Sequence, residues 1–301
     1  MYYSTLVLSG GSLHTLKYVG AIRYLCEKNI ARNIKTVIGT SCGAIVGMLF
    51  ALGLKDHEIF TVFRAFLKSH TATTPDFDNI FNIFYTLGID DGTCLRQCLQ
   101  DAIKLKFSQD DLTFIELAKK TGVNLLVCAC RVRDLGETVF SVDTTPNLSV
   151  VQAVLASSAI PIIFKPVPIN GEFYLDGALS VNCPVKFVHP SQLGDTLCFR
   201  IQEEEACDGK PASPQNPPPM PNLASFMFSL LINSINKLNK NNLSITTPVK
   251  YINFSPIKSS NPDFCTNRFC FDMRSMKFKV DVDDDTTIIT RGYEIAQKEL
   301  N

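Results

Sequence analysis

The chain carries no excess of charge of either sign. Lysine plus arginine and aspartate plus glutamate each number 29, so the formal net charge is +0 at pH 7. Proteins that bind nucleic acid usually present basic patches, and no basic block stands out in this sequence. We therefore expect no nucleic-acid partner and favour a small or neutral one.

An apolar run long enough to cross a membrane is also missing. The longest run, residues 44–54, falls short of the about 20 residues that a spanning helix needs, and we interpret it as a core helix. The first residues lack a basic region followed by an apolar core, so we expect no signal peptide. The 11 cysteines lie mostly in apolar runs, which favours buried thiols and a reducing, cytoplasmic location.

Metal and nucleotide motifs are absent from the sequence. The four histidines are far apart, and Cys128 and Cys130 have no second cysteine pair to complete a metal site. The loop at Gly10 and Gly11 continues into neither G-x-G-x-x-G nor Gly-Lys-Ser/Thr, which argues against phosphate binding. We expect neither a metal nor a cofactor.

Length and composition favour one α/β domain over residues 1–301. The chain is 46% hydrophobic, which is enough to bury a full core. We expect a helical insert at about 56–115 and, from its proline, glycine and acidic residues, a flexible loop at about 203–222. Residues 223–240 are amphipathic, so they either cover the sheet or contact a membrane surface.

Short apolar segments alternate with segments of helical spacing. This order predicts parallel strands joined by right-handed crossovers. The predicted strands are 5–9, 35–38, 124–132, 138–142, 173–175, 196–201 and 249–254, and the predicted helices are 16–28, 44–54, 149–158 and 286–300.

A serine stands between two glycines where a predicted strand runs into a predicted helix. Gly39, Ser41 and Gly43 form the pattern G-x-S-x-G, which is the pattern of a nucleophile elbow. The sharp turn pushes a hydroxyl outward, and flanking residues without side chains leave room for it. A chain of this length shows the pattern by chance about 0.1 times. Ser41 is therefore the candidate nucleophile.

A serine nucleophile needs a base to accept its proton. The last histidine, His189, lies beside Pro190, where a structural or surface role fits better than catalysis. Asp176 follows a short predicted strand and precedes Gly177, so a tight turn can hold its carboxylate at the carboxyl edge of the sheet. Burial can raise the pKa of such a carboxylate and make it a base. The alternative for Asp-Gly is an ordinary turn.

The loop between the first strand and the first helix supplies a third element. Its residues are Gly10, Gly11, Ser12 and Leu13. Backbone N–H groups in such a loop can point at a developing oxyanion, and the helix that follows adds its positive end. We predict an oxyanion loop here.

These three pieces, in this order, resemble the patatin-like phospholipase family. Two further segments add to the resemblance. They are Ala156-Ser157-Ser158-Ala159-Ile160-Pro161 with Phe164-Lys165-Pro166-Val167, and Tyr174-Leu175-Asp176-Gly177-Ala178 with Asn182-Cys183-Pro184-Val185. The resemblance covers residues 6–185 and extends more loosely to the C-terminus.

The resemblance implies a three-layer α/β/α fold with a mostly parallel central sheet, related to α/β-hydrolases. It also implies a Ser-Asp dyad that works without metal. By position, Ser41 would be the nucleophile and Asp176 the base, with the loop Gly10 to Leu13 as the oxyanion hole. Supporting positions would be Gly39, Gly43, His14 and Gly177.

The sequence departs from the family pattern in the oxyanion loop and after the aspartate. Ser12 and Thr15 stand where the family usually has glycines, His14 where it has lysine or arginine, and Ala178 where it often has glycine. A histidine at position 14 would carry a charge only part of the time near neutral pH. The departures leave the level of activity open.

The function predicted from these features is acyl-ester hydrolysis of lipids, of phospholipase A or lysophospholipase type. The substrate would be a phospholipid or another fatty-acyl ester, reached through transient contact with a membrane surface. Two alternatives stay open. The chain could be a weak or inactive module that binds lipid or protein, or an esterase or thioesterase outside lipid metabolism.

Overall fold

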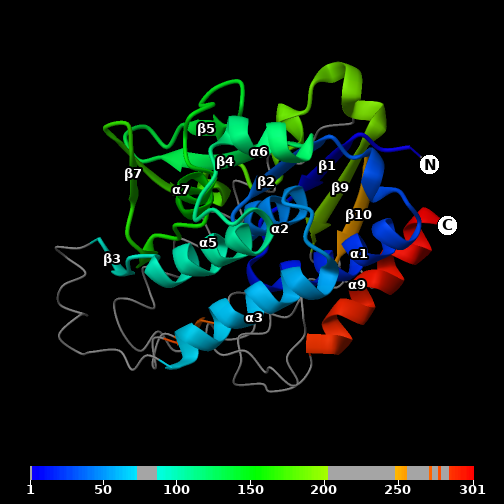
Figure 1. The fold of residues 1–301 in the computed structure, drawn as a ribbon, viewed down its shortest axis with the longest axis horizontal. Coiled ribbons are helices and arrows are strands. Elements are labelled where there is room, and N and C mark those ends of the chain that lie inside the picture. The colour runs from blue at the N-terminus through cyan, green and yellow to red at the C-terminus, as the bar shows by residue number, and fades with distance from the viewer. Residues whose placement is uncertain (1, 73–86, 203–247, 256–270, 273–276, 279–284) are drawn as a thin grey trace, which may run out of the picture.

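The computed structural model describes residues 2–72, 87–202, 248–255, 271–272, 277–278 and 285–301 (Figure 1). The loop expected at about 203–222 and the amphipathic helix expected at 223–240 lie outside these ranges. Two short strands, β11 (Phe271–Asp272) and β12 (Lys277–Phe278), form an antiparallel pair of their own.

One mostly parallel sheet organises the described residues. It has eight strands in the order β10-β9-β1-β2-β4-β8-β7, with β5 paired to β4 as well. The first five strands in this order are parallel, whereas β5 and β8 run antiparallel to β4, and β7 antiparallel to β8. The strands are β1 (Thr5–Leu8), β2 (Thr36–Thr40), β4 (Asn124–Arg131), β5 (Glu137–Phe140), β7 (Val167–Ile169), β8 (Glu172–Asp176), β9 (Thr196–Ile201) and β10 (Lys250–Phe254).

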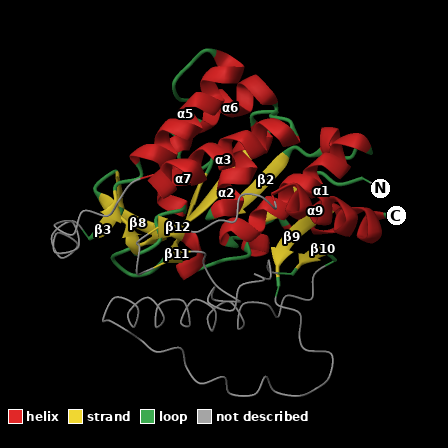
Figure 2. Ribbon diagram, turned by 90° about the horizontal axis from the view of Figure 1, so that it is seen from below, coloured by secondary structure: helices red, strands yellow, loops and turns green. Residues whose placement is uncertain are grey.

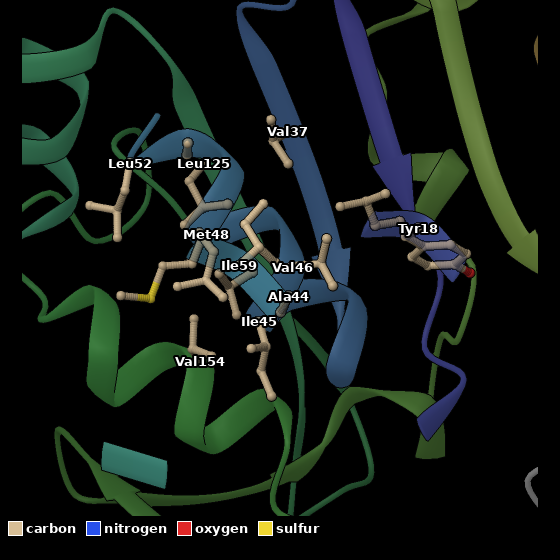
Figure 3. Packing of buried hydrophobic residues seen from close by; sticks show 14 of the residues in the cluster. Tyr18, Val37, Ala44, Ile45, Val46, Met48, Leu52, Ile59, Leu125 and Val154 are labelled. Atoms are coloured by element: carbon tan, nitrogen blue, oxygen red, sulfur yellow. The ribbon is translucent and has the colours of Figure 1, made fainter. Parts of the chain in front are cut away.

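The α-helices of the described residues lie on one face of this sheet (Figure 2). Alternation along β1 sends Leu6 and Leu8 to the helical face and Val7 to the other. Figure 3 shows α2 and α7 packed against β2 and β4 through Met48, Val154, Val37 and Leu125. The helices are α1 (Leu16–Glu27), α2 (Cys42–Ala51), α3 (Asp56–Ala72), α5 (Thr93–Phe107), α6 (Phe114–Thr121), α7 (Val150–Ser157) and α9 (Asp285–Leu300).

The opposite face is covered, within the described ranges, by short 3-10 helices. Val181 and Val185, around η3 (Gly177–Leu179) and η4 (Pro184–Phe187), pack there against β1, β2 and β9. The predicted fold class, α/β with a mostly parallel central sheet, is confirmed. In the described residues, the third layer consists of this segment of short 3-10 helices.

The predicted elements agree with the observed ones within one to three residues. The strand at 196–201 is β9 without change, and Ser149 caps α7 by accepting a hydrogen bond from the Gln152 N–H. Within the insert predicted to be helical, at about 56–115, the structure has the short strand β3 (Gly88–Asp90), which pairs with β6 (Ile162–Phe164). Three-residue strands have too few residues to show a period.

The described cysteines are eight free thiols, three of them buried: Cys128, Cys130 and Cys198. Cys26 is exposed, and Cys42, Cys94, Cys98 and Cys183 are partly exposed. The expectation of mostly buried thiols therefore holds for fewer than half of the described cysteines. No helix in the described ranges combines the length and apolar character that a bilayer crossing requires.

Three aromatic rings join α1 to the far strands of the sheet. The centroids of Tyr18 and Phe254 are 5.2 Å apart, those of Phe199 and Phe254 5.4 Å, and all three side chains are fully buried. Such edge-to-face contacts add to the free energy gained by burial. This cluster fixes α1, and the loop before it, against β9 and β10.

We predict that Phe254→Ala lowers the free energy of unfolding by about 3–5 kcal/mol, because it leaves a cavity among these rings. Urea unfolding followed by circular dichroism measures the change. Phe173→Ala is the control, since the Phe173 side chain is 53% exposed, and it should cost within about 0.5 kcal/mol. Equal losses in the two variants would contradict the role of the cluster.

Candidate active site

The sharp turn predicted at Ser41 is present between β2 and α2. Ser41 has φ 55° and ψ −132°, a backbone conformation that residues other than glycine rarely adopt. Strain of this kind persists only where the surroundings hold the residue in place. A Cβ at Gly43 would lie 2.4 Å from the Leu8 carbonyl oxygen, and one at Gly39 2.6 Å from the Ala44 Cα. Both positions therefore need glycine.

Ser41 and Asp176 meet because two strands end head to head on one edge of β4. Cys128 of β4 pairs with Thr40 of β2 on one side and with β5 on the other. The next residue, Ala129, pairs with Asp176 of β8, again opposite β5. Since β5 occupies the other edge, β2 and β8 share this one and approach each other from opposite directions.

This geometry corrects one detail of the sequence interpretation. Asp176 was expected at the carboxyl edge of a parallel sheet, but it ends an antiparallel strand and lies within the span of β4, which continues to Arg131. Asp176 still reaches Ser41, because the carboxyl ends of β2 and β8 converge.

The two side chains form a short hydrogen bond inside the protein. Ser41 Oγ donates to Asp176 Oδ2 at 2.6 Å, and the Ala178 N–H donates to Asp176 Oδ1 at 2.8 Å. Ser41 is 5% exposed and Asp176 3%. Gly177 opens η3 directly after the aspartate. The carboxylate thus has one oxygen held by the turn and the other on the serine.

Burial raises the pKa of Asp176 to about 6, while the hydrogen bonds from Ser41 and Ala178 act in the opposite direction. The carboxyl is therefore mostly ionised at neutral pH and accepts a proton more readily than an exposed aspartate. Its charge acts on two thiols, those of Cys42 on α2 and Cys130 on β4. Burial raises the pKa of both thiols, to about 12 for Cys42, so they stay neutral.

The predicted oxyanion loop lies beside Ser41. A Cβ at Gly10 would come within 3.1 Å of the Ser41 Cβ. Ser12 has φ 50°, so the serine adopts the left-handed conformation for which glycine is usual. The 3-10 helix η1 (Ser12–Thr15) begins here and runs into α1, and the first N–H groups of a helix have no partner within it.

Two expectations for this loop are wrong in detail. The Gly10 N–H donates to the Asn182 carbonyl at 3.1 Å, so it is not available to an oxyanion. This leaves Gly11, Ser12 and Leu13 as the candidate donors. His14 is not partly charged near neutral pH, because burial, and then the charge of Lys17, lower its pKa to about 4.

The remaining histidines described by the structure lie elsewhere. His189 caps η5 (Pro190–Asp195), with its Nδ1 2.8 Å from Ser191 Oγ, and His57 is an exposed residue of α3. In the described ranges, no cluster of at least three His, Cys, Asp or Glu side chains could hold a metal ion. The hydroxyl of Ser41 is thus hydrogen-bonded to a carboxylate.

Comparison with known proteins assigns the chain to a family. The model of the family described as Patatin-like phospholipase matches residues 6–189. The chain belongs to this family. The matched range contains the Ser41 elbow, the Gly10 loop and Asp176.

Two relatives of this patatin-like chain come from viruses, and one similar structure comes from a bacterium. Probable lipid hydrolase 463L of Invertebrate iridescent virus 6 is 33% identical over 186 residues, 61% of this chain and 62% of that protein. Uncharacterized protein R571 of Acanthamoeba polyphaga mimivirus is 24% identical over 274 residues, 91% of this chain and 88% of that protein. The crystal structure of VipD from Legionella pneumophila has a TM-score of 0.55 and 17% identity, and covers 99% of this chain and 66% of that one. The chain thus spans under two thirds of the iridescent virus protein and about two thirds of VipD.

Sequence reasoning gave no role to two residues that contact the site. Asn182 forms two hydrogen bonds with Gly10. Its backbone carbonyl accepts from the Gly10 N–H, and its Nδ2 donates to the Gly10 carbonyl at 3.3 Å. Ser157 Oγ accepts from the Ser41 N–H at 2.9 Å. Both residues lie in the segments that carry the patatin-like resemblance, and that was the one signal for them in the sequence.

The raised pKa of Asp176 predicts how stability depends on pH. A carboxyl with pKa 3.8 when unfolded and about 6 when folded favours the folded state below pH 3.8, and this contribution is lost as pH rises through 6. Asp176→Asn removes the buried charge. We predict that the variant gains about 3 kcal/mol relative to wild type between pH 4 and pH 8.

Urea unfolding of both proteins across this range measures the difference. Asp134→Asn is the control, because the Asp134 carboxyl lies at the surface and its pKa is held down, to about 2, mainly by a hydrogen bond from Arg131. The two variants should therefore depart from wild type in different pH ranges. A constant difference between Asp176→Asn and wild type would contradict the raised pKa.

Proposed function

We propose that this chain is a lipid acyl hydrolase of phospholipase A or lysophospholipase type, with Ser41 as nucleophile and Asp176 as base. The observation that carries the proposal is the 2.6 Å hydrogen bond from Ser41 Oγ to Asp176 Oδ2 at a strained strand-to-helix turn. This distance suits a proton transfer between the two oxygens.

In the first step, Ser41 Oγ attacks the carbonyl carbon of a fatty-acyl ester while its proton passes to Asp176 Oδ2. The protonated carboxyl then returns this proton to the oxygen of the leaving alcohol, and an acyl-serine remains. A water molecule attacks that ester with Asp176 again as base, and the fatty acid is released. One carboxylate serves both halves, since its pKa of about 6 lies close to neutral pH.

The negative oxygen that develops on the carbonyl would be held by backbone N–H groups. Two helices begin beside Ser41: η1, which leads into α1, and α2, whose first residue is Cys42. The N–H groups of the loop residues Gly11, Ser12 and Leu13, and that of Cys42, lie at these helix starts, where unpaired donors and the helix dipole favour negative charge. Neutral His14 adds no full positive charge to this site.

The assignment to lipid esters draws on the family and on the printed name of the iridescent virus relative, Probable lipid hydrolase 463L. Phospholipid or another fatty-acyl ester would be the substrate, bound at a membrane or micelle surface. Turnover of micellar phospholipid is compared with turnover of a short soluble ester. A lipid hydrolase should be faster on the micelles, whereas an esterase outside lipid metabolism should not.

We predict that Ser41→Ala lowers fatty-acid release by at least about 10³-fold, because no other hydroxyl replaces the nucleophile. Release from mixed micelles is measured by mass spectrometry, and labelling by a fluorophosphonate probe should vanish together with activity. Ser191→Ala, at the exposed Ser191 of η5, is the control and should keep both. Wild-type activity in Ser41→Ala would refute the dyad.

We also predict that kcat/KM rises with pH and levels off above about 6, because the base is the ionised Asp176 carboxylate. Below that pH the rate should fall about tenfold for each unit. Initial rates between pH 4.5 and pH 8.5, in buffers of constant ionic strength, give the profile. A midpoint near the ordinary aspartate pKa would show that the carboxyl is not buried as described.

A further inference from the structure

The hydroxyl of Ser157, at the end of α7, bridges the strand that carries the nucleophile and its neighbour. Ser157 Oγ accepts from the Ser41 N–H at 2.9 Å and donates to the Cys128 carbonyl of β4 at 2.6 Å. Its side chain is fully buried. The hydroxyl proton is donated to the Cys128 carbonyl, and a lone pair of the same oxygen accepts the Ser41 N–H. These two hydrogen bonds together fix the orientation of the hydroxyl.

The bridge stands where the ladder of the sheet breaks. The Cys128 carbonyl lies in the gap between the end of β2 and the end of β8, after the last β2 to β4 pair, Thr40 with Cys128. A further direct ladder bond would keep Ser41 extended. The hydroxyl satisfies both backbone groups while Ser41 turns to φ 55°.

The same end of α7 also holds the base. Two residues after Ser157, the Ala159 carbonyl accepts from the Asp176 N–H at 2.9 Å. One short segment, residues 157–159, therefore contacts the backbone of both members of the proposed dyad. The separation of Ser41 and Asp176 depends on this segment as well as on the sheet.

We infer that Ser157 is a positioning residue of the active site: its hydroxyl fixes the peptide before Ser41 so that Ser41 Oγ stays on Asp176. The inference rests on the proposed function for its kinetic consequence, but the geometry that it describes can be tested without turnover. Removing the hydroxyl leaves the buried Ser41 N–H and Cys128 carbonyl without this partner, which favours a rearrangement of the turn.

Ser157→Ala is compared with Ser158→Ala and Ser157→Thr. Ser158 is the neighbouring buried serine, 6% exposed, and its hydroxyl has no hydrogen-bond partner among the described residues. Ser157→Ala should lower kcat about 10- to 100-fold with KM changed less than about twofold, since a small misplacement of a reacting group has this effect. Ser158→Ala should retain wild-type kinetics, and Ser157→Thr, which keeps a hydroxyl, should recover most of the rate.

A second readout distinguishes positioning from loss of stability. The hydrogen bond from Ser41 lowers the pKa of Asp176, so a displaced serine should let that pKa rise. Carbon-13 NMR titration of the Asp176 carboxyl should show a higher pKa in Ser157→Ala than in wild type. Ser41→Ala should raise the pKa too, and Ser158→Ala should leave it unchanged. Thermal unfolding confirms that each variant is folded over the titration range.

The outcomes separate the two proposals. If wild type hydrolyses no ester but Ser157→Ala still shifts the Asp176 pKa, the proposed function fails and the positioning role stands. If wild type is active and Ser157→Ala alters neither kcat nor that pKa, the positioning role is overturned. Equal losses in Ser157→Ala and Ser158→Ala would overturn it too, because they would reflect general packing at the end of α7.

Discussion

The structure of the site depends on a shared edge of β4. Two strands of opposite direction, β2 and β8, use this edge and stop where they meet, between Cys128 and Ala129. A strand that cannot continue must turn away from the sheet. The chain does so directly after each strand, at Ser41 after β2 and at Gly177 after β8. The meeting of these strand ends brings together two side chains that are far apart in sequence.

This arrangement explains how the proposed dyad, which contains no histidine, can be held in place. An imidazole base is usually oriented by a third side chain, whereas Asp176 is oriented by backbone on three sides: the pairing with β4, the Ala178 N–H and the Ala159 carbonyl. A short carboxylate has only two torsions to fix. The strain at Ser41 and the burial of Asp176 both cost free energy, and the surrounding core, which buries all of β1 and most of β2 and α2, offsets this cost.

Much of the fold could be predicted from the sequence, because the strands and helices of the core have clear periods. Gly39, Ser41 and Gly43 marked the elbow through their spacing, and Asp176 was marked by its place at the end of a strand. The direction of β8 could not be predicted, since a five-residue strand carries no sign of its orientation. The engagement of the Gly10 N–H was hidden too, because it depends on Asn182, a residue distant in sequence.

The strand β9 gives the boundary of the family match a structural meaning. The match ends at residue 189, yet β9 (Thr196–Ile201) pairs with the whole of β1 and supports the loop at Ser9 through Phe199 and Ile201. A fragment cut at residue 189 would leave β1, whose residues are fully buried, as an open edge with unpaired backbone groups. Such edges recruit other chains, so a fragment that keeps β1 inside the sheet must include β9, which lies beyond the matched region.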